Sequence, residues 1–545
     1  MSNQLRTIAV DLTPVLPGGE NGGAKIVVLE LLRCLADMAP DTQFVLLTQA
    51  ISHDELATMD RPNMRRLIVA GSLERGSLRM RAQGVVTKVL PYFPVRLRRV
   101  VGRLASRVLT NFKRSASGSL LRDMEVDLLF CPFTAPTYFE PGLPTVCTIH
   151  DLQYKTYPEF FTPEDVSHRD RVFIDVCNKA TAIIAVSDYS RSSAMGHGEI
   201  KSDRIRTILH RMAKRSSTDL KENKEVVRRY GLLPGKYLIY PANFWRHKNH
   251  EMLLTAFGIA CHEGLPADIK LLCTGAPGAR QACLKNAACE MGLEGRVVFP
   301  GYLPSNDLVT LMENSNGMIF PSLYEGFGLP VIEAMAAGVP VACSNTASLP
   351  EVVGDAAILF DPKLPVQIAQ SIVSLVKNEA LRARLVRAGQ QRVDEFADSS
   401  RMAREYWDVF LYAMGNQKHV DLLTGVYEDG WASSQISISV APARIKQFLV
   451  LELFLPEFTP CEKMRVRIAK EFCRSVDDSI YFSRGKSTTL TLDFPADGGR
   501  VAISISPSFI PSHYGFGEDG RLLSVMVRRC TIERDESERV SLYGA

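Results

Sequence analysis

The chain has 545 residues, of which 46% are hydrophobic and 23% are charged, and this balance excludes a disordered or fibrous protein. A net charge of +4 is too small to indicate a nucleic-acid partner. The length suffices for about three domains, each with its own core.

The twelve cysteines are scattered, without a Cys-x-x-Cys pair or a Cys/His cluster at zinc spacing. This pattern argues against a disulfide framework and a structural zinc site. The N-terminal MSNQLRTIAVDLTP lacks the apolar stretch of a signal peptide, and nowhere do 18 apolar residues follow one another. We therefore expect a cytoplasmic protein that is neither exported nor membrane-spanning.

In the first part of the chain, strand-like runs alternate with segments of helical period; the runs are TIAVDL, QFVLLT, VDLLFCP, PTVCTIHD and TAIIAVSD. This alternation predicts a parallel sheet with helices on both faces. We assign residues 1–205 to this first domain.

The same alternation restarts at KYLIYPAN and continues through IKLLCTG, RVVFPG, GMIFPS, VPVACS and AAILFD. It predicts a second doubly wound α/β domain at 206–415, which ends in a helical segment from about Pro365 to Met414. The polar run KRSSTDLKENKE joins the two domains.

After residue 419 the pattern changes to closely spaced strands: ISISV, FLVLELFLP, STTLTLDFP, VAISIS and LLSVMVRRCTI. This pattern predicts a separate antiparallel β-sandwich at 419–545. Trp431 and Tyr514 have two interpretations there. They stack on sugar rings, as in a carbohydrate-binding module, or they belong to the core of a scaffold or dimerisation domain.

The stretch PSLYEGFGLPVIEAMAAG, residues 321–338, follows the predicted strand GMIF. Pro330 suits the first position of a helix, and Gly338 ends it. Gly326 and Gly328 let the backbone approach a bulky anion, which the free N–H groups at the helix start would face. Ligands of open α/β sheets bind at such strand ends, so the stretch predicts a phosphate or diphosphate site.

Two carboxylates share this stretch, Glu325 in the loop and Glu333 on the first turn of the helix. Carboxylates repel a diphosphate but accept hydrogen bonds from hydroxyl groups, so they suit a sugar and a ribose. The alternative is that Glu333 only complements the helix dipole and that Glu325 is solvated.

This Glu-x7-Glu frame resembles the signature of the retaining glycosyltransferases of family 4, which have the GT-B fold of two facing Rossmann-like domains. The similarity spans roughly residues 7–415 and includes YPANFWRHKNH, TIHDLQYKTYPEFF, VSDYSR and LPEVVGDAAILFDP in the expected order. The resemblance implies that Glu325 lies near the donor sugar and that Glu333 holds the nucleotide ribose. Backbone N–H groups around Gly326, Phe327 and Gly328 would meet the diphosphate.

By the same resemblance, Lys248 neutralises the leaving diphosphate. Many family members also carry an arginine five or six residues earlier, where this chain has Asn243 and Ala242. Either Arg246 supplies the charge from a shifted position, or Asn243 replaces it with a neutral donor.

In the first domain, the glycine-rich PGGENGGAK follows the first strand, and it is either a ligand loop or a flexible connection. The resemblance places Gly22 and Gly23 over the donor phosphates. His150, at the end of PTVCTIH, should project into the crevice, and the resemblance puts it beside the anomeric centre. Ser187, at the end of TAIIAVS, is a further candidate for the crevice wall.

No Asp-x-Asp occurs in the chain, so we expect a metal-independent enzyme. It needs no cofactor beyond a GDP- or UDP-linked sugar as co-substrate.

Between Arg75 and Arg122 there are 12 Lys or Arg residues and no acidic residue. Apolar and basic positions there follow a helical period, which indicates either binding to an anionic membrane surface or a solvated basic face.

The sequence thus predicts a retaining glycosyltransferase of bacterial surface-polysaccharide synthesis, with mannose from GDP-mannose as the leading donor. The acceptor would be a glycan or a polyprenyl-linked sugar, and the protein would be cytoplasmic or peripheral at the inner face of the membrane. The alternatives are a non-catalytic sugar-nucleotide or glycan-binding subunit, and a GT-B phosphorylase or epimerase.

Overall fold

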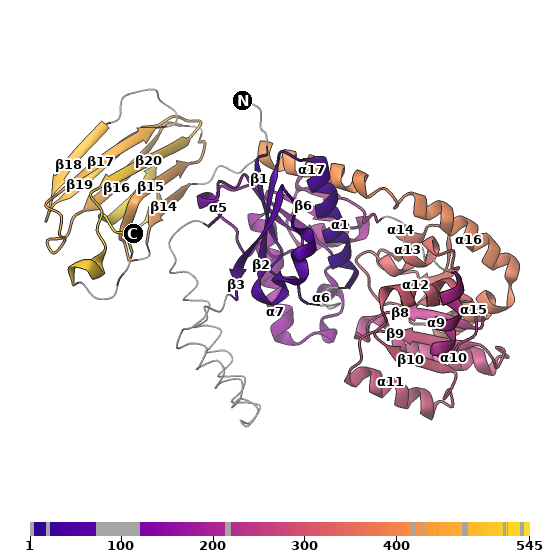
Figure 1. The fold of residues 1–545 in the computed structure, drawn as a ribbon. Coiled ribbons are helices and arrows are strands. Elements are labelled where there is room, and N and C mark those ends of the chain that lie inside the picture. Colours follow the sequence, from indigo (N-terminus) through magenta and orange to yellow (C-terminus); the bar gives the residue numbers. More distant parts are fainter. Residues whose placement is uncertain are drawn as a thin grey trace. The chain divides into compact units, whose positions relative to one another are not determined.

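Short apolar runs in the sequence form two separate parallel sheets in the computed structural model (Figure 1). The structure describes residues 5–17, 22–71, 120–212, 220–416 and 421–544, the last with gaps at 428, 444, 471–477, 516–518, 520 and 535–538. The basic stretch predicted at 75–122 lies outside these residues, except for 120–122.

In the described part of the first domain, the strand order is β3-β2-β1-β4-β5-β6-β7, and all neighbouring strands are parallel. The strands are β1 (Thr7–Asp11), β2 (Gln43–Gln49), β3 (Met64–Ala70), β4 (Leu128–Cys131), β5 (Thr145–Ile149), β6 (Ala182–Ala185) and β7 (Ile205–Thr207). Its helices are α1 (Gly22–Met38), α2 (Ala50–His53), α6 (Gln153–Thr156), α7 (Pro163–Lys179) and α8 (Asp188–His197). The short helix α5 (Leu120–Asp123) precedes β4 in the sequence and belongs to the compact unit that contains the tail. The order reverses beside β1, and ligands of α/β sheets bind at such a reversal.

The second sheet has the order β10-β9-β8-β11-β12-β13 and is also parallel. Its strands are β8 (Tyr237–Pro241), β9 (Lys270–Thr274), β10 (Val297–Gly301), β11 (Gly317–Phe320), β12 (Val341–Ser344) and β13 (Ala357–Phe360). The helices are α9 (Leu220–Arg229), α10 (His250–His262), α11 (Ala279–Glu290), α12 (Ser305–Glu313), α13 (Leu329–Ala336), α14 (Leu349–Val353), α15 (Pro365–Lys377), α16 (Glu379–Asp394) and α17 (Ser399–Gly415). Both predicted parallel sheets are therefore present.

The last helix, α17, returns to the first domain. Its side chains Tyr406 and Phe410 lie against Phe130 of β4, with ring centroids 5.7 and 5.1 Å apart, inside the core of the first sheet. The core of the first domain therefore includes a helix that follows the whole second sheet in the sequence.

The tail, taken separately, consists of two antiparallel sheets with the orders β14-β15-β20-β17-β18 and β19-β16-β21-β22 among its described residues. The strands are β14 (Leu422–Val426), β15 (Ala432–Val440), β16 (Gln447–Phe454), β17 (Lys463–Lys470), β18 (Asp478–Ser483), β19 (Ser487–Phe494), β20 (Gly499–Ser506), β21 (Met526–Glu533) and β22 (Arg539–Tyr543). Alternate residues of both sheets form one core, so the predicted sandwich is confirmed. Trp431 is half-buried against Phe458 and Phe509, whereas Tyr514 is exposed.

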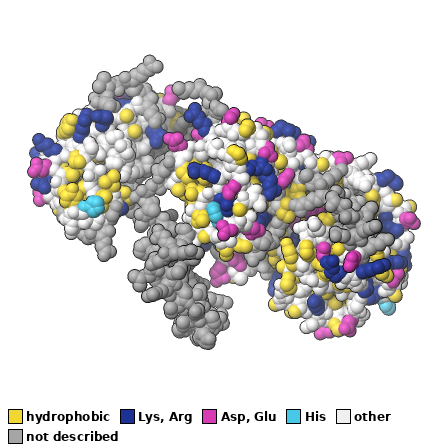
Figure 2. Space-filling view, in the orientation of Figure 1, with side chains coloured by type: hydrophobic (Ala, Val, Ile, Leu, Met, Phe, Trp, Pro, Cys, Tyr) yellow, Lys and Arg dark blue, Asp and Glu magenta, His cyan; other side chains and the backbone are white. Residues whose placement is uncertain are grey.

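The surface of the two α/β domains carries charges of both signs. On the face shown in Figure 2, Lys and Arg side chains of the described residues are interspersed with Asp and Glu side chains. This agrees with the small net charge of the chain. Among the helices that can be described, none combines the length and apolar character required to cross a membrane.

Candidate active site

One cavity of about 1310 Å³ is lined by residues of both α/β domains. Eleven of the predicted site residues line it: Gly22, Gly23, His150, Asn243, Arg246, Lys248, Glu325, Gly326, Phe327, Gly328 and Glu333. Ser187 does not line it, and the expectation for that residue is wrong; its side chain is fully buried behind the wall.

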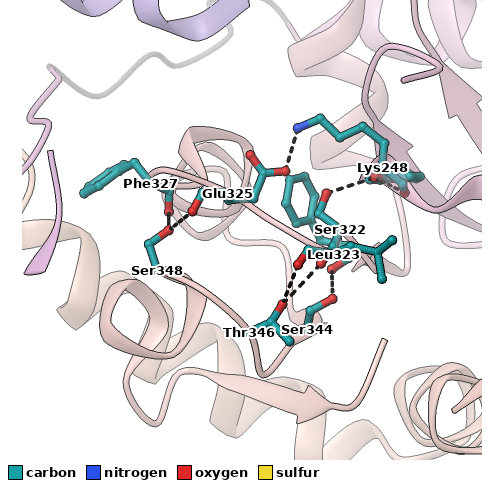
Figure 3. A network of polar contacts seen from close by, with 10 residues as sticks. Lys248, Ser322, Leu323, Glu325, Phe327, Ser344, Thr346 and Ser348 are labelled. Carbon is teal, nitrogen blue, oxygen red and sulfur yellow. Dashed lines mark hydrogen bonds and ion pairs between the residues drawn. The ribbon is translucent and has the colours of Figure 1, made fainter. Parts of the chain in front are cut away.

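Hydroxyl groups of neighbouring segments hold the loop after β11 in place (Figure 3). Ser348 Oγ donates to the carbonyl oxygens of Glu325 and Phe327, both at 3.0 Å, and Thr346 Oγ1 lies 3.3 Å from the carbonyl oxygen of Leu323. These bonds fix the backbone on both sides of the Glu325 side chain. The backbone that carries the Glu325 side chain is therefore held in place.

The Glu325 carboxylate points at the amino group of Lys248 (Figure 3). Lys248 Nζ lies 2.5 Å from Glu325 Oε1, and the two side chains are 11% and 12% exposed. Lys248 ends a short 3-10 helix, Arg246–Lys248, and its carbonyl oxygen accepts a 2.6 Å bond from the Tyr240 hydroxyl. A nearly buried ion pair contributes little to stability, but it keeps two opposite charges together at the site.

Gly326 and Gly328 in this loop are required for different structural reasons. A Cβ on Gly326 would lie 1.9 Å from the carbonyl oxygen of His150, so the close approach is to the backbone of the other domain rather than to an anion. Ser187 Oγ donates to the Gly326 carbonyl oxygen at 2.7 Å and strengthens this contact. Gly328 has a φ of +100°, which a residue with a side chain rarely adopts, and it caps α13.

The start of α13 offers backbone donors to the cavity. Among the residues that the structure describes, none accepts a hydrogen bond from the N–H groups of Gly326, Phe327 or Gly328. A Cβ on Gly23 would lie 2.6 Å from Leu329 Cδ1, so the glycine-rich turn of the first domain faces this helix start. Glu333 lies half-buried just beyond the first turn of α13, not in it as expected. Unpaired N–H groups at a helix start form a site for an anion.

The ring of His150 has a defined protonation state. Its Nε2 lies 2.7 Å from the carbonyl oxygen of Pro132, and since a carbonyl only accepts, Nε2 carries the proton. Burial lowers the pKa of His150, so the ring is neutral near pH 7. Its Nδ1 is then an acceptor that can receive a hydrogen bond from a hydroxyl group.

Arg246 and Asn243, the two candidates to replace the arginine of other family members, lie in different environments. Arg246 is exposed at the cavity, whereas Asn243 is half-buried and its Oδ1 accepts a 3.0 Å bond from the N–H of Ala276. The amide group of Asn243 is thus oriented by the backbone. Arg280 of α11 also lines the cavity and was not predicted.

Three further groups were missed from the sequence. His210 and Gln153 line the cavity, and each also has a buried side-chain nitrogen, Nδ1 of His210 and Nε2 of Gln153, without a partner among the described residues. Glu351 of α14 accepts bonds of 2.8 and 2.9 Å from the N–H groups of Asp188 and Tyr189, and so ties the start of α8 to the second domain. Gln153 and Glu351 lie in the segments TIHDLQYKTYPEFF and LPEVVGDAAILFDP, but the contacts of all three residues depend on parts of the chain that are distant in sequence.

His250, at the start of α10, predicts a pH dependence of stability. Burial lowers its pKa from 6.5 to about 3, so the native ring stays neutral while the unfolded chain takes up a proton below about pH 6.5. Stability is therefore lost as the pH falls, by about 1.4 kcal/mol at pH 5.5. Urea unfolding measures this at pH 8 and 5.5. Between these pH values, the free energy of unfolding should fall less in His250→Leu than in the natural protein, by this amount. Exposed His168→Leu is the control, and an equal loss in both variants would contradict the assignment.

Comparison with known proteins gives the following matches. Residues 21–210 match the family described as Glycosyltransferase Family 4, and residues 224–392 match Glycosyl transferases group 1. The chain is 32% identical over 259 residues to O-antigen chain mannosyltransferase B of Escherichia coli, over 46% of this chain and 66% of that protein. It is 28% identical over 236 residues to the serotype-specific mannosyltransferase WbdA of Escherichia coli, over 40% of this chain and 27% of WbdA.

Two solved structures show the same fold. Anabaena HepE, crystallised with UDP and glucose, superposes with a TM-score of 0.54 at 16% identity, over 75% of this chain and 100% of HepE. WaaG, a glycosyltransferase involved in lipopolysaccharide biosynthesis, superposes with a TM-score of 0.52 at 14% identity, over 74% of this chain and 99% of WaaG. The predicted GT-B fold is confirmed for the two α/β domains.

Proposed function

This chain belongs to the group 1, family 4 glycosyltransferases, and on that premise we propose that it transfers a sugar from a nucleotide diphosphate to a hydroxyl group of a glycan or lipid-linked acceptor. One observation carries the proposal: eleven predicted site residues, which lie between Gly22 and Glu333 in the sequence, line one cavity. Mannose from GDP-mannose is the leading donor, because the relatives at 32% and 28% identity are mannosyltransferases.

The donor diphosphate would lie at the start of α13. The unpaired N–H groups of Gly326, Phe327 and Gly328 suit its oxygens, and Lys248 supplies a positive charge beside them. Arg246 adds charge from the exposed side of the cavity, in place of the arginine that other members carry. Since these cations stabilise the leaving group, we propose that the reaction needs no metal ion.

The two glutamates would hold hydroxyl groups of the donor. Glu325 forms an ion pair with Lys248, and we propose that the pair separates when the donor binds. Lys248 then turns to the diphosphate and Glu325 to the sugar, and each buried charge keeps a partner. Glu333, one turn further along α13, would accept from the ribose.

The proposed reaction retains the configuration of the sugar. The bond between C1 and the diphosphate oxygen breaks, and a bond between C1 and the acceptor oxygen forms on the same face. The acceptor proton passes to the leaving diphosphate oxygen, so the charges balance. Lys248 and the loop N–H groups stabilise the charge on the leaving oxygen, while neutral His150 orients the sugar through Nδ1.

We propose that the reaction belongs to the synthesis of a bacterial surface polysaccharide, because the relative at 32% identity is an O-antigen chain mannosyltransferase. The acceptor would then be a polyprenyl-linked glycan at the inner face of the membrane. The basic stretch 75–122 would contact anionic lipids there.

The first test is to incubate the protein with GDP-, UDP-, ADP- and dTDP-sugars in EDTA and to measure release of the nucleoside diphosphate. We expect release from GDP-mannose that EDTA does not change and that Glu325→Ala lowers by at least 100-fold. Glu290→Ala, an exposed glutamate of α11, is the control and should keep full activity.

Two results would contradict the proposal. Release that depends on an added metal ion would exclude the metal-independent reaction. Nucleotide binding without release, with oligomannoside acceptors present, would identify a non-catalytic binding subunit instead.

A further inference from the structure

The loops at one end of the tail sandwich bring four aromatic rings together. Trp431 precedes β15, and Phe458 follows β16. Phe509 and Tyr514 follow β20. An isolated bridge pairs Trp431 with Met526, the first residue of β21, so loops of both sheets meet at this end. We call the four rings the aromatic platform, and none of them lines the cavity of the candidate active site.

The rings of the platform form a row with both ends at the surface. Phe458 and Tyr514 are 57% and 56% exposed, whereas Trp431 is half-buried and Phe509 is buried. The ring centroids of Phe458 and Trp431 lie 6.0 Å apart, those of Trp431 and Phe509 5.7 Å, and those of Phe509 and Tyr514 6.4 Å. All three contacts are edge-to-face, a favourable geometry for aromatic rings. The inner rings therefore hold the two outer rings at the surface.

Hydrogen bonds also hold the segments that carry the platform. Phe509 and Leu523 exchange two backbone bonds of 2.8 Å. Arg521 Nη2 lies 2.7 Å from Asp519 Oδ2 and 2.6 Å from Asp429 Oδ2, which ties the residues before β21 to those before β15. A surface that is ordered before its ligand arrives loses less conformational entropy on binding.

The polar groups beside the platform suit hydroxyl groups better than phosphates. Asp429 lies two residues before Trp431, and Glu457 directly precedes Phe458; both carboxylates are exposed. A carboxylate accepts hydrogen bonds from hydroxyl groups and repels a phosphate. The charge of Arg521 is already compensated by its two carboxylate partners.

The exposed apolar area is too small for a stable contact with another protein. An aromatic side chain buries 150–250 Å² in full, so Phe458, Tyr514 and the 47% exposed Leu522 together offer a few hundred Å². A stable interface takes about 800 Å² from each partner. A sugar ring fits, because its C–H faces pack on an aromatic ring while its hydroxyl groups reach the carboxylates.

We propose that the aromatic platform is a second glycan site, outside the active-site cavity, and that it binds neutral sugar residues of the glycan that the enzyme extends. This inference rests on the proposed function for the identity of the glycan, an α-mannan. Phe458 and Tyr514 contact the sugar rings, and Trp431 acts through Phe458 as a positioning residue.

The test is electrophoresis of the full chain in native gels that contain soluble α-mannan at increasing concentrations. We expect mannan to retard the natural protein, and the dissociation constant follows from the mobility. Phe458→Ala and Tyr514→Ala should each weaken binding by about two- to tenfold, since each loses one stacking contact. The thermal midpoint and the hydrolysis of GDP-mannose should change little, because both rings are exposed and lie outside the cavity.

Tyr481→Ala is the matched control. Tyr481 of β18 is 63% exposed, but its ring lies against Arg465, with the guanidinium carbon 5.8 Å from the ring centroid. This variant should be retarded like the natural protein. Glu325→Ala, which alters the active-site cavity, should also keep its retardation, and Phe458→Ala/Tyr514→Ala in the same background should remove it.

Three results would overturn the inference. They are the absence of retardation of the natural protein, equal retardation of the natural protein and Phe458→Ala/Tyr514→Ala, and sedimentation of the natural protein as a dimer that this double variant dissociates. The last result would identify a contact between two copies of the chain. Retardation that depends on the platform, without any turnover of GDP-mannose, would refute the proposed function and leave the glycan site in place.

Discussion

Replacing Lys248 by alanine is expected to lower kcat/KM by about 100- to 1000-fold, because a buried positive charge beside the leaving diphosphate is lost. The effect should appear mainly in kcat, since the negative charge on the leaving oxygen grows during the reaction. Steady-state release of the nucleoside diphosphate measures both constants.

The same change leaves the Glu325 carboxylate, which is 12% exposed, without its partner. Loss of one member of a buried pair destabilises a protein by about 3–5 kcal/mol, so stability has to be measured beside activity. The double variant Lys248→Ala/Glu325→Gln removes the unpaired charge and should recover the thermal midpoint but not the rate. Lys236→Ala breaks a half-exposed pair with Asp268 in the same domain and should change neither. Normal turnover by a folded Lys248→Ala would exclude the assigned role.

Replacing Gly326 by alanine is expected to lower kcat/KM by about 100-fold. The added Cβ would lie 1.9 Å from the His150 carbonyl oxygen, a backbone atom of the other domain that no side-chain rotation can move away. The loop would have to shift by about 1 Å or more, and a shift of this size near reacting groups costs about 100-fold in rate. Kinetics with the donor at saturation measure the change.

Gly278→Ala is the matched control, because Gly278 lies in the same domain, has an extended φ and has open space where the Cβ would be. This variant should keep its activity. Secondary structure should remain in Gly326→Ala, since the clash concerns one contact between the domains. A Gly326→Ala enzyme as fast as the natural protein would show that this contact is absent during catalysis.

Most of the regular structure follows from local pattern. Runs such as TIAVD and YLIYP are apolar, and they recur between segments of helical period, so the parallel sheets were predictable. The strands β3 and β7 were not predicted, because edge strands mix buried and exposed positions and β7 has three residues. In the tail, β17 was missed because its charged and apolar residues alternate.

The turn chemistry of PSLYEGFGLPVIEAMAAG was also sufficient to predict a strand, a loop and a helix start. Local pattern indicates a left-handed glycine such as Gly328, because the requirement lies in its own φ. Gly326 has no such requirement. Glycine is needed at position 326 because the carbonyl oxygen of His150, 176 positions earlier in the chain, leaves no room for a Cβ.

The assembly of the site depended on contacts that no periodicity encodes. Ser187 was expected in the wall, yet it is buried and bonds to Gly326. The unpaired amide nitrogen of Gln153 and the contact of the Glu351 carboxylate with the start of α8 both depend on the folded arrangement of distant segments. Helices and strands follow from hydrogen bonds and apolar spacing over a few residues, which the sequence carries in order. Which polar atoms remain without a partner in a cavity depends on the approach of distant segments, and only the folded chain specifies that approach.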